Sequence, residues 1–91
     1  MIKIVIPTAL RKYCQELASV EVSATQVGEA LQALVEQHPA LKSHLMDASG
    51  KLRSFVNLYL GEEDVRGLQR EATPLKAGDE LTIIPAIAGG L

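Results

Sequence analysis

The sequence predicts an α+β domain in which one amphipathic helix packs across one face of a mixed sheet of four to five strands. At the start of the chain Ile2, Ile4 and Ile6 alternate with other residues, a period of two that is typical of a strand. Between Thr25 and His38 the apolar residues recur with the spacing of one helix face; they are Val27, Ala30, Leu31, Leu34 and Val35. Because a single amphipathic helix has to bury its apolar stripe on another layer, we expect it to lie on the sheet.

Further strands are predicted from short apolar runs bounded by turn residues: 20–22, 55–60 and 81–84. We expect Val65 and Leu68 to belong to a short edge strand that follows an acidic turn at 62–64. Thr25 is a good N-cap for the helix, and the ring of Pro39 blocks its continuation. This order of elements is that of a β-grasp fold with the last strand in the centre of the sheet.

The composition is that of one ordinary globular domain, with 91 residues, 47% hydrophobic and 22% charged. We assign residues 1–85 to this domain and residues 86–91, which lack a strand or helix pattern, to a flexible tail. A net charge of −2 with both signs interspersed gives no electrostatic footprint for nucleic acid. No apolar run approaches the roughly 20 residues of a membrane span. We expect a cytoplasmic protein without membrane contact, monomeric when free.

Few residues offer catalytic or metal-binding chemistry. Cys14 is the single cysteine, which excludes an intramolecular disulfide and a cysteine-ligated zinc or iron–sulfur site, and it is expected to pack as a small apolar residue. His38 and His44 lie on either side of a proline without an adjacent cysteine, so we interpret them as surface histidines. The carboxylates at 62–64 fall in a solvated turn, where nothing would desolvate them as acid–base catalysis requires. We expect a non-catalytic protein with no bound metal or cofactor.

The end of the chain contains two glycines, Gly89 and Gly90, followed by Leu91. Glycine adds backbone entropy and no packing, so these residues do not help folding. A segment without Cβ atoms is thin enough to pass through a narrow channel into another protein's active site, and the stretch from Pro85 to Gly90 can extend about 17–20 Å. Fraying of a glycine-rich terminus is the ordinary alternative. Behind a predicted β-grasp domain, a functional tail is favoured.

The predicted sheet has an outward face with more apolar surface than solvation requires. With regular alternation, Phe55, Tyr59 and Ile84 point away from the helix. Exposed apolar patches often mark partner sites, and aromatic residues are enriched at interface cores. We expect these three residues to bind a partner protein, unless a loop covers them.

A resemblance to a known family is carried by five segments: Ile6-Pro7-Thr8, Leu45-Met46-Asp47, Phe55-Val56-Asn57-Leu58-Tyr59, Glu63-Asp64-Val65-Arg66 and, most specifically, GDELTIIPAIAGG at 78–90. They resemble the ubiquitin-like sulfur carriers, which include the thiamine-pathway sulfur carrier and the small subunit of molybdopterin synthase. Within that family the sequence is most similar to the sulfur carrier of a bacterial cysteine-biosynthesis route.

The resemblance implies a mechanism in which partner enzymes act on the tail. An E1-like activating enzyme spends ATP to convert the carboxylate of Gly90 to an acyl-adenylate. A sulfur donor then displaces AMP and leaves a thiocarboxylate, whose sulfur a partner synthase delivers to its acceptor. In this interpretation Gly89 is the flexible approach, and Phe55 and Tyr59 belong to a docking surface.

Leu91 departs from the family pattern, whose mature end is Gly-Gly. The carboxyl group of Gly90 is tied up in a peptide bond to Leu91. We expect a peptidase to remove Leu91 first, since some relatives carry extra residues that a metallopeptidase trims. The alternatives are a mature form that differs from this sequence and a protein that is not loaded in the usual way.

Three functions remain open from the sequence. The first is a sulfur carrier, for which the resemblance prefers cysteine as the product over thiamine thiazole, molybdopterin or tRNA thiouridine. The second is a ubiquitin-like modifier that joins the same activated glycine to lysines of target proteins. The third is a protein-interaction module without tail chemistry.

Overall fold

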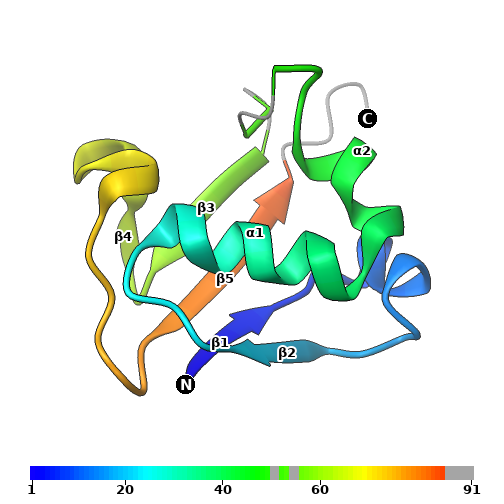
Figure 1. Ribbon diagram of the computed structural model, residues 1–91, viewed down its shortest axis with the longest axis horizontal. Coiled ribbons are helices and arrows are strands. Elements are labelled where there is room, and N and C mark those ends of the chain that lie inside the picture. Colours follow the sequence, from blue (N-terminus) through cyan, green and yellow to red (C-terminus); the bar gives the residue numbers. More distant parts are fainter. Residues whose placement is uncertain (50–51, 54–55, 86–91) are drawn as a thin grey trace.

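The computed structural model describes residues 1–49, 52–53 and 56–85, in which a five-stranded sheet forms one layer and helices cover one of its faces (Figure 1). The strands in chain order are β1 (Ile2–Val5), β2 (Ser19–Val22), β3 (Val56–Leu60), β4 (Glu63–Asp64) and β5 (Glu80–Pro85). Their spatial order is β2-β1-β5-β3-β4, which places the last strand in the centre. The predicted fold class, a mixed sheet with one main helix across it, is confirmed.

The direction of the strands makes the sheet mixed. β1 pairs antiparallel with β2, where Ile4 lies opposite Val20, and it pairs parallel with β5, where Ile4 lies opposite Leu81. On its other side β5 pairs antiparallel with β3 over the full length of that strand, from Val56 opposite Pro85 to Leu60 opposite Leu81. β5 therefore has a hydrogen-bonded neighbour on each side, as predicted.

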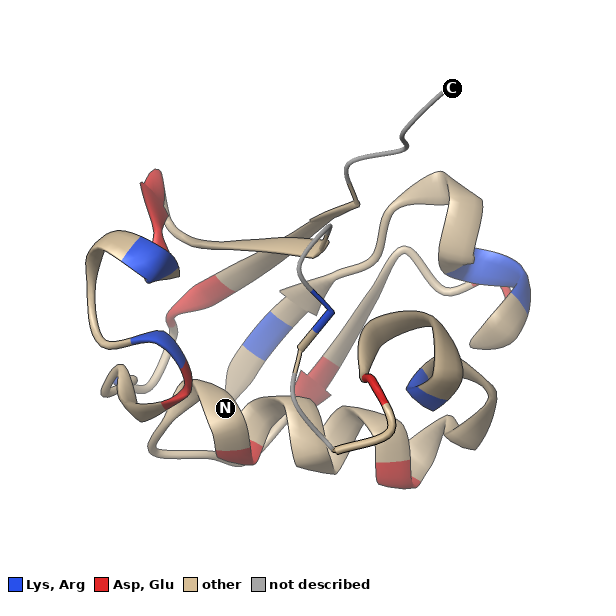
Figure 2. Cartoon of the chain, turned by 90° about the horizontal axis from the view of Figure 1, so that it is seen from above, with Lys and Arg blue, Asp and Glu red and all other residues tan. Residues whose placement is uncertain are grey.

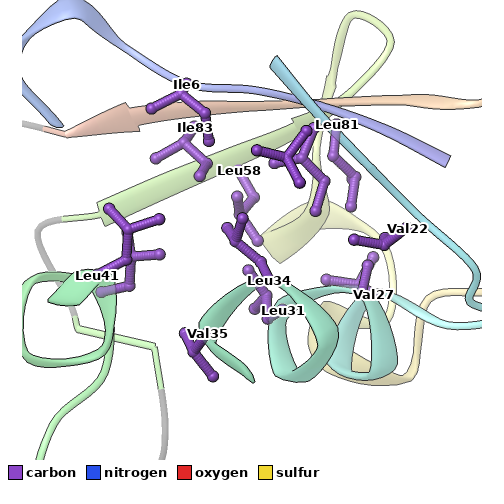
Figure 3. Close-up of a cluster of buried hydrophobic side chains, with 14 of the residues drawn as sticks. Ile6, Val22, Val27, Leu31, Leu34, Val35, Leu41, Leu58, Leu81 and Ile83 are labelled. Atoms are coloured by element: carbon purple, nitrogen blue, oxygen red, sulfur yellow. The ribbon is translucent and has the colours of Figure 1, made fainter. Parts of the chain in front are cut away.

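The main helix, α1 (Val27–Gln37), buries the stripe that the sequence predicts: Val27, Ala30, Leu31, Leu34 and Val35. Figure 3 shows this stripe facing the inner side of the sheet, where Leu58, Leu81 and Ile83 point toward the helix. The inward residues of the sheet are almost completely buried, including Ile4, Val56, Leu58, Leu81 and Ile83. Removal of this apolar surface from water is the main favourable term for the fold.

The start of α1 differs in detail from the prediction. The helix begins at Val27, and Gln26 rather than Thr25 occupies the N-cap position, without a side-chain cap bond. Thr25 still takes part, because its backbone N–H and its hydroxyl both donate to Glu29 Oε1 at 2.8 Å. The carboxylate of the first turn thus satisfies a backbone donor at the helix entry, as in a capping box shifted by one residue.

The end of α1 confirms the role of Pro39. The helix stops at Gln37, and a short 3₁₀ turn, η2 (Pro39–Leu41), leads into α2 (Lys42–Leu45). Leu41 and Leu45 are buried, which attaches this second helical segment to the core.

The predicted edge strand at Val65 and Leu68 is wrong. The edge strand is the two-residue β4, formed by residues that the sequence assigns to an acidic turn, and Val65 begins the 3₁₀ turn η3 (Val65–Gly67). Gly61, with φ +62°, allows the chain to turn back directly after β3, so that Leu60 pairs with Glu63. Asp64 then accepts a hydrogen bond from the backbone N–H of Arg66 at 2.9 Å, which turns the chain out of the sheet.

The link between Glu29 and Thr25 gives a prediction about stability and pH. Accepting the backbone hydrogen bond of Thr25, and then that of its hydroxyl, lowers the pKa of Glu29 below its ordinary value. Because the folded-state pKa is the lower one, the stabilisation is present above the ordinary glutamate pKa and is lost as pH falls through the folded value. We expect Glu29→Gln to lower the thermal midpoint at neutral pH and to have a shrinking effect as the solution is acidified.

Glu36→Gln is the matched control, since Glu36 accepts a bond from the side chain of Gln32 and not from the helix entry. Thermal unfolding of both variants from neutral to acidic pH is the measurement. A deficit for Glu29→Gln that stays constant at every pH would contradict the prediction.

Candidate functional site

The central strand β5 forms the base from which the predicted tail leaves the domain. Its last residue, Pro85, lies opposite Val56 at the start of β3, and the ladder between the two strands continues without a gap to Leu81. Pairing with β1 covers the first part of β5, from Glu80 to Thr82. At Pro85, the last residue before the predicted tail, β5 is held by β3 alone, because the pairing with β1 ends at Thr82.

One face of the sheet, here called the outer face, consists of the residues that point away from α1: Val5, Asn57, Tyr59, Thr82 and Ile84. Tyr59 lies opposite Thr82, and Thr82 lies opposite Val5, so these three form one row across β3, β5 and β1. Asn57 and Ile84 form the next row, one step closer to Pro85. Ile84 is 44% exposed, and the others are half-buried.

A charged row lies on the same side of the sheet at the end far from Pro85. Lys3 pairs with Glu21 of β2 and with Glu80 at the start of β5, and all three side chains are exposed. Opposite charges on directly opposed positions stabilise a sheet and keep it soluble. The outer face therefore changes along β5 from charged residues to uncharged ones. Its uncharged end, here called the apolar end because it carries Val5, Tyr59 and Ile84, also includes Asn57 and Thr82 and adjoins Pro85.

The structure places only some of the predicted site residues. Tyr59 and Ile84 lie on the outer face on neighbouring strands, as predicted from their alternation. Phe55, Gly89, Gly90 and Leu91 lie outside the described residues, as does the whole predicted tail at 86–91. Their roles remain predictions.

The sequence analysis did not single out the charged row, although its signal was present. Lys3, Glu21 and Glu80 occupy strand positions with the parity of the outer face. The sequence does not show which of these positions lie opposite one another, because the register of the strands decides it. The parallel pairing of β1 with β5 places Lys3 opposite Glu80, which is far away in the chain.

Cys14 is buried, which confirms its predicted packing role. It follows the 3₁₀ helix η1 (Thr8–Tyr13), which the sequence analysis did not predict, and burial raises the pKa of its thiol. A buried, protonated thiol is a poor nucleophile.

His44 is not an isolated surface histidine. Its ring stacks on that of Tyr13 with 4.0 Å between centroids, which joins α2 to η1. Across the described part of the chain, no cluster of three His, Cys, Asp or Glu side chains is placed to hold a metal ion.

The described residues also show how charge is distributed over the fold and how long its helices are. Figure 2 shows acidic and basic residues interspersed over the fold rather than gathered on one side. None of the helices found in residues 1–49, 52–53 and 56–85 is long and apolar enough to cross a bilayer.

Comparisons with known proteins identify a family and several relatives. The model of the ThiS family matches residues 4–90. The sulfur carrier protein CysO of Mycobacterium tuberculosis is 41% identical over 87 residues, which cover 93% of this chain and 94% of the relative. The small archaeal modifier protein 1 of Haloferax volcanii is 46% identical over 65 residues, or 70% of this chain and 69% of the relative. Among solved structures, one from the BexX/CysO complex of Amycolatopsis orientalis superposes with a TM-score of 0.89 at 37% identity, covering 99% of this chain and all of the other.

Two adjacent residues of β5 test whether the apolar end of the outer face is needed for folding. Ile83 points into the core and is 1% exposed, whereas Ile84 is 44% exposed. We expect Ile83→Ala to lower the free energy of unfolding by about 2–5 kcal/mol. The same change at Ile84 should cost about 1 kcal/mol or less.

Urea denaturation of both variants measures the difference. Equal losses would show that Ile84 is covered by the folded chain in solution, and the outer face would then be unavailable to a partner.

Proposed function

Because the chain belongs to the ThiS family, we propose that it is a sulfur carrier that presents Gly90 to partner enzymes for loading as a thiocarboxylate. The observation that carries this proposal is the extent of the family match, which runs through the domain and ends at Gly90. The match thus includes the glycine pair as well as the fold. The similarity to CysO, named a sulfur carrier protein and matched over 94% of its length, supports the same function.

The proposed chemistry needs an activated carboxyl group, because a carboxylate is a poor electrophile. An E1-like activating enzyme transfers AMP from ATP to the carboxylate of Gly90 and releases pyrophosphate. A sulfur donor then attacks the acyl carbon, AMP leaves, and the sulfur remains on Gly90 as –COS⁻. The carrier supplies recognition and reach, and ATP binds to the partner rather than to this chain.

The described residues supply a central strand, β5, that ends at the root of the proposed tail, and an apolar surface beside it. We propose that this apolar end of the outer face, with Tyr59 and Ile84, docks on the activating enzyme and on a sulfur-accepting synthase.

The product of the pathway is proposed as cysteine, from the similarity to CysO. The solved structure of CysO in complex with BexX shows that a protein of this kind binds a partner.

A ubiquitin-like modifier is the second candidate. It is favoured by the 46% identity to the small archaeal modifier protein 1. A modifier would form amide bonds between its terminal glycine and lysines of other proteins, whereas a carrier would accumulate as the free thiocarboxylate. Mass spectrometry of the protein and its conjugates in cells distinguishes the two.

Leu91 gives the sharpest prediction for the tail. The carboxyl group of Gly90 is in an amide bond to Leu91, so a chain that ends at Leu91 places its free carboxylate one residue, about 3.5 Å, too far along. It also carries an isobutyl group into a channel that suits glycine. We expect a chain ending at Gly90 to be activated readily and the chain ending at Leu91 to be a poor substrate until a peptidase removes Leu91.

Intact mass after incubation with the activating enzyme, ATP and a sulfide source measures loading. Exchange of one oxygen for sulfur adds about 16 Da, from atomic masses, to the competent chain. Equal rates of gain for both chains would remove the need for processing. If neither chain gains the mass while a known carrier does, the sulfur-carrier proposal is wrong.

The docking role of the outer face predicts a loss of affinity for Tyr59→Ala. Truncation of an aromatic residue at the centre of an interface often costs about 2 kcal/mol or more, which is about 30-fold in Kd. Glu21→Ala is the control, since it lies on the same side of the sheet in the charged row. Calorimetric titration against the activating enzyme is the measurement, after circular dichroism has shown that both variants fold. Unchanged affinity for Tyr59→Ala and for Phe55→Ala would place the docking surface elsewhere.

A further inference from the structure

The two edges of the sheet differ in how far they are open to another strand. At one edge β4 has only two residues, and the chain leaves the sheet at Asp64 through the turn that Arg66 closes. At the other edge β2 has four residues in regular alternation, and in the described part of the chain no strand lies beyond it. Proteins usually shorten, bend or cover an edge strand, because its unpaired backbone groups bind other strands. The edge at β2 has none of these protections.

The backbone groups of β2 point in two directions. Across the antiparallel ladder, the N–H of Ile6 donates to the carbonyl oxygen of Ala18 at 2.8 Å. Alternate residues of a strand bond to the same neighbour, so Val20 and Val22 also bond to β1. The N–H and C=O groups of Ser19 and Glu21 therefore point away from β1, toward the open edge. These two residues offer two donors and two acceptors to an added strand.

The residue opposite Glu21 confirms this alternation. Lys3 directs its own N–H to the other side of β1, where it donates to the carbonyl oxygen of Asp79 at 3.0 Å. Among the side chains of β2, Val20 and Val22 are buried, whereas Glu21 is exposed. The edge therefore offers backbone groups and a carboxylate to a partner, and its valines belong to the core.

A row of alternating charge ends at this edge. Glu80 of β5, Lys3 of β1 and Glu21 of β2 occupy directly opposed positions, so one ammonium group lies between two carboxylates. In the part of the chain that the structure describes, no hydrogen bond or ion pair occupies the carboxylate of Glu21. Opposite charges at directly opposed positions of a sheet attract, and like charges repel. The next position in the row, on a strand beside β2, is therefore suited to a cation.

The segment that leads into β2 carries backbone strain. Gln15 and Glu16 have φ +61° and +62°, in the left-handed region that residues with a side chain rarely adopt. Residues 15–18 are all exposed, so the core gains no burial from these side chains. The N–H of Glu16 donates to the carbonyl oxygen of Arg11 at 2.7 Å, which holds the turn in place. Strained residues of this kind cluster at binding sites.

From these observations we propose that β2 binds an extended segment of a partner protein, which adds an antiparallel strand to the sheet and places Lys or Arg opposite Glu21. The backbone groups of Ser19 and Glu21 provide the attachment, and the charge row selects the segment. A second copy of this chain fits less well. Its β2 would place a carboxylate opposite Glu21, or Ser19 in a register shifted by two residues, and neither supplies a cation. The site does not depend on the chemistry of the tail.

The test uses the full chain and a defined probe. A blocked peptide of sequence Thr-Val-Lys-Val-Thr, whose residues favour strands, is added to isotopically labelled protein, and amide hydrogen exchange is followed by NMR. At about 90% saturation we expect exchange at Ser19 and Glu21 to slow about tenfold, because only the free fraction exchanges. Val20 and Val22 should change little, since their N–H groups already bond to β1. This alternation distinguishes strand addition from non-specific binding.

The same peptide with glutamate in place of lysine tests the role of charge. We expect it to bind about threefold or more weakly at low ionic strength, and the difference should shrink as salt is added. Glu21→Lys should reverse the preference between the two peptides. Glu80→Lys is the matched control, because it makes the same charge change in the same row but lies on the central strand. It should leave the affinity for the lysine peptide within about twofold.

Ser19→Pro tests the backbone bonds while keeping the charge of Glu21. Proline removes an N–H that points away from β1, so the ladder within the fold keeps its donors. We expect the affinity for the lysine peptide to fall about fivefold or more, with little change in the thermal midpoint. If this variant does not fold, the Glu21→Lys result decides.

Several results would overturn the proposal. They are unchanged exchange at Ser19 and Glu21 at saturating peptide, equal affinity for the two peptides at low salt, or an unchanged affinity of Glu21→Lys for the lysine peptide. Protection of the same two amides that rises with protein concentration in the absence of peptide would assign the edge to a second copy of the chain instead.

Discussion

Pairing on both sides of β5 is the constraint on which the rest of the structure depends. Leu81 lies opposite Ile4 on one side and opposite Leu60 on the other, so β5 has its ladder partners only when both neighbouring strands are in place. Its partner β1 is parallel, and parallel strands cannot be joined by a tight turn. The chain between them therefore has to cross the sheet, and α1 is the element that makes this crossing and covers the inner face.

The two faces of the sheet differ in how strictly packing determines their residues. The inner face must match the stripe of α1, so residues such as Ile83 are determined by packing. In the described part of the chain no helix covers the outer face (Figure 1), and its side chains are more exposed than those of the inner face. The change from the charged pairs of Lys3 to the exposed Ile84 is therefore a better guide to partners than any feature of the core. It leads toward Pro85, the residue before the predicted tail.

The size of the domain agrees with the proposal that the chemistry of the tail belongs to partner enzymes. A domain of this size has one core, and its buried thiol, Cys14, is part of it.

By itself the sequence determined the elements whose residues are close together in the chain. The alternation at Ile2–Ile6 and the stripe of α1 predicted strand, helix and inward faces, because local periodicity and burial agree there. Glycine at 89 and 90 predicted a tail, although that segment lies outside the described residues.

Only the tertiary structure decided the rest. Val65 and Leu68 read as a strand, but the turn at Gly61 and the bond from Arg66 to Asp64 end the sheet earlier. The pairing of Lys3 with Glu80 joins residues far apart in the chain, and such proximity follows from strand register that no local pattern encodes.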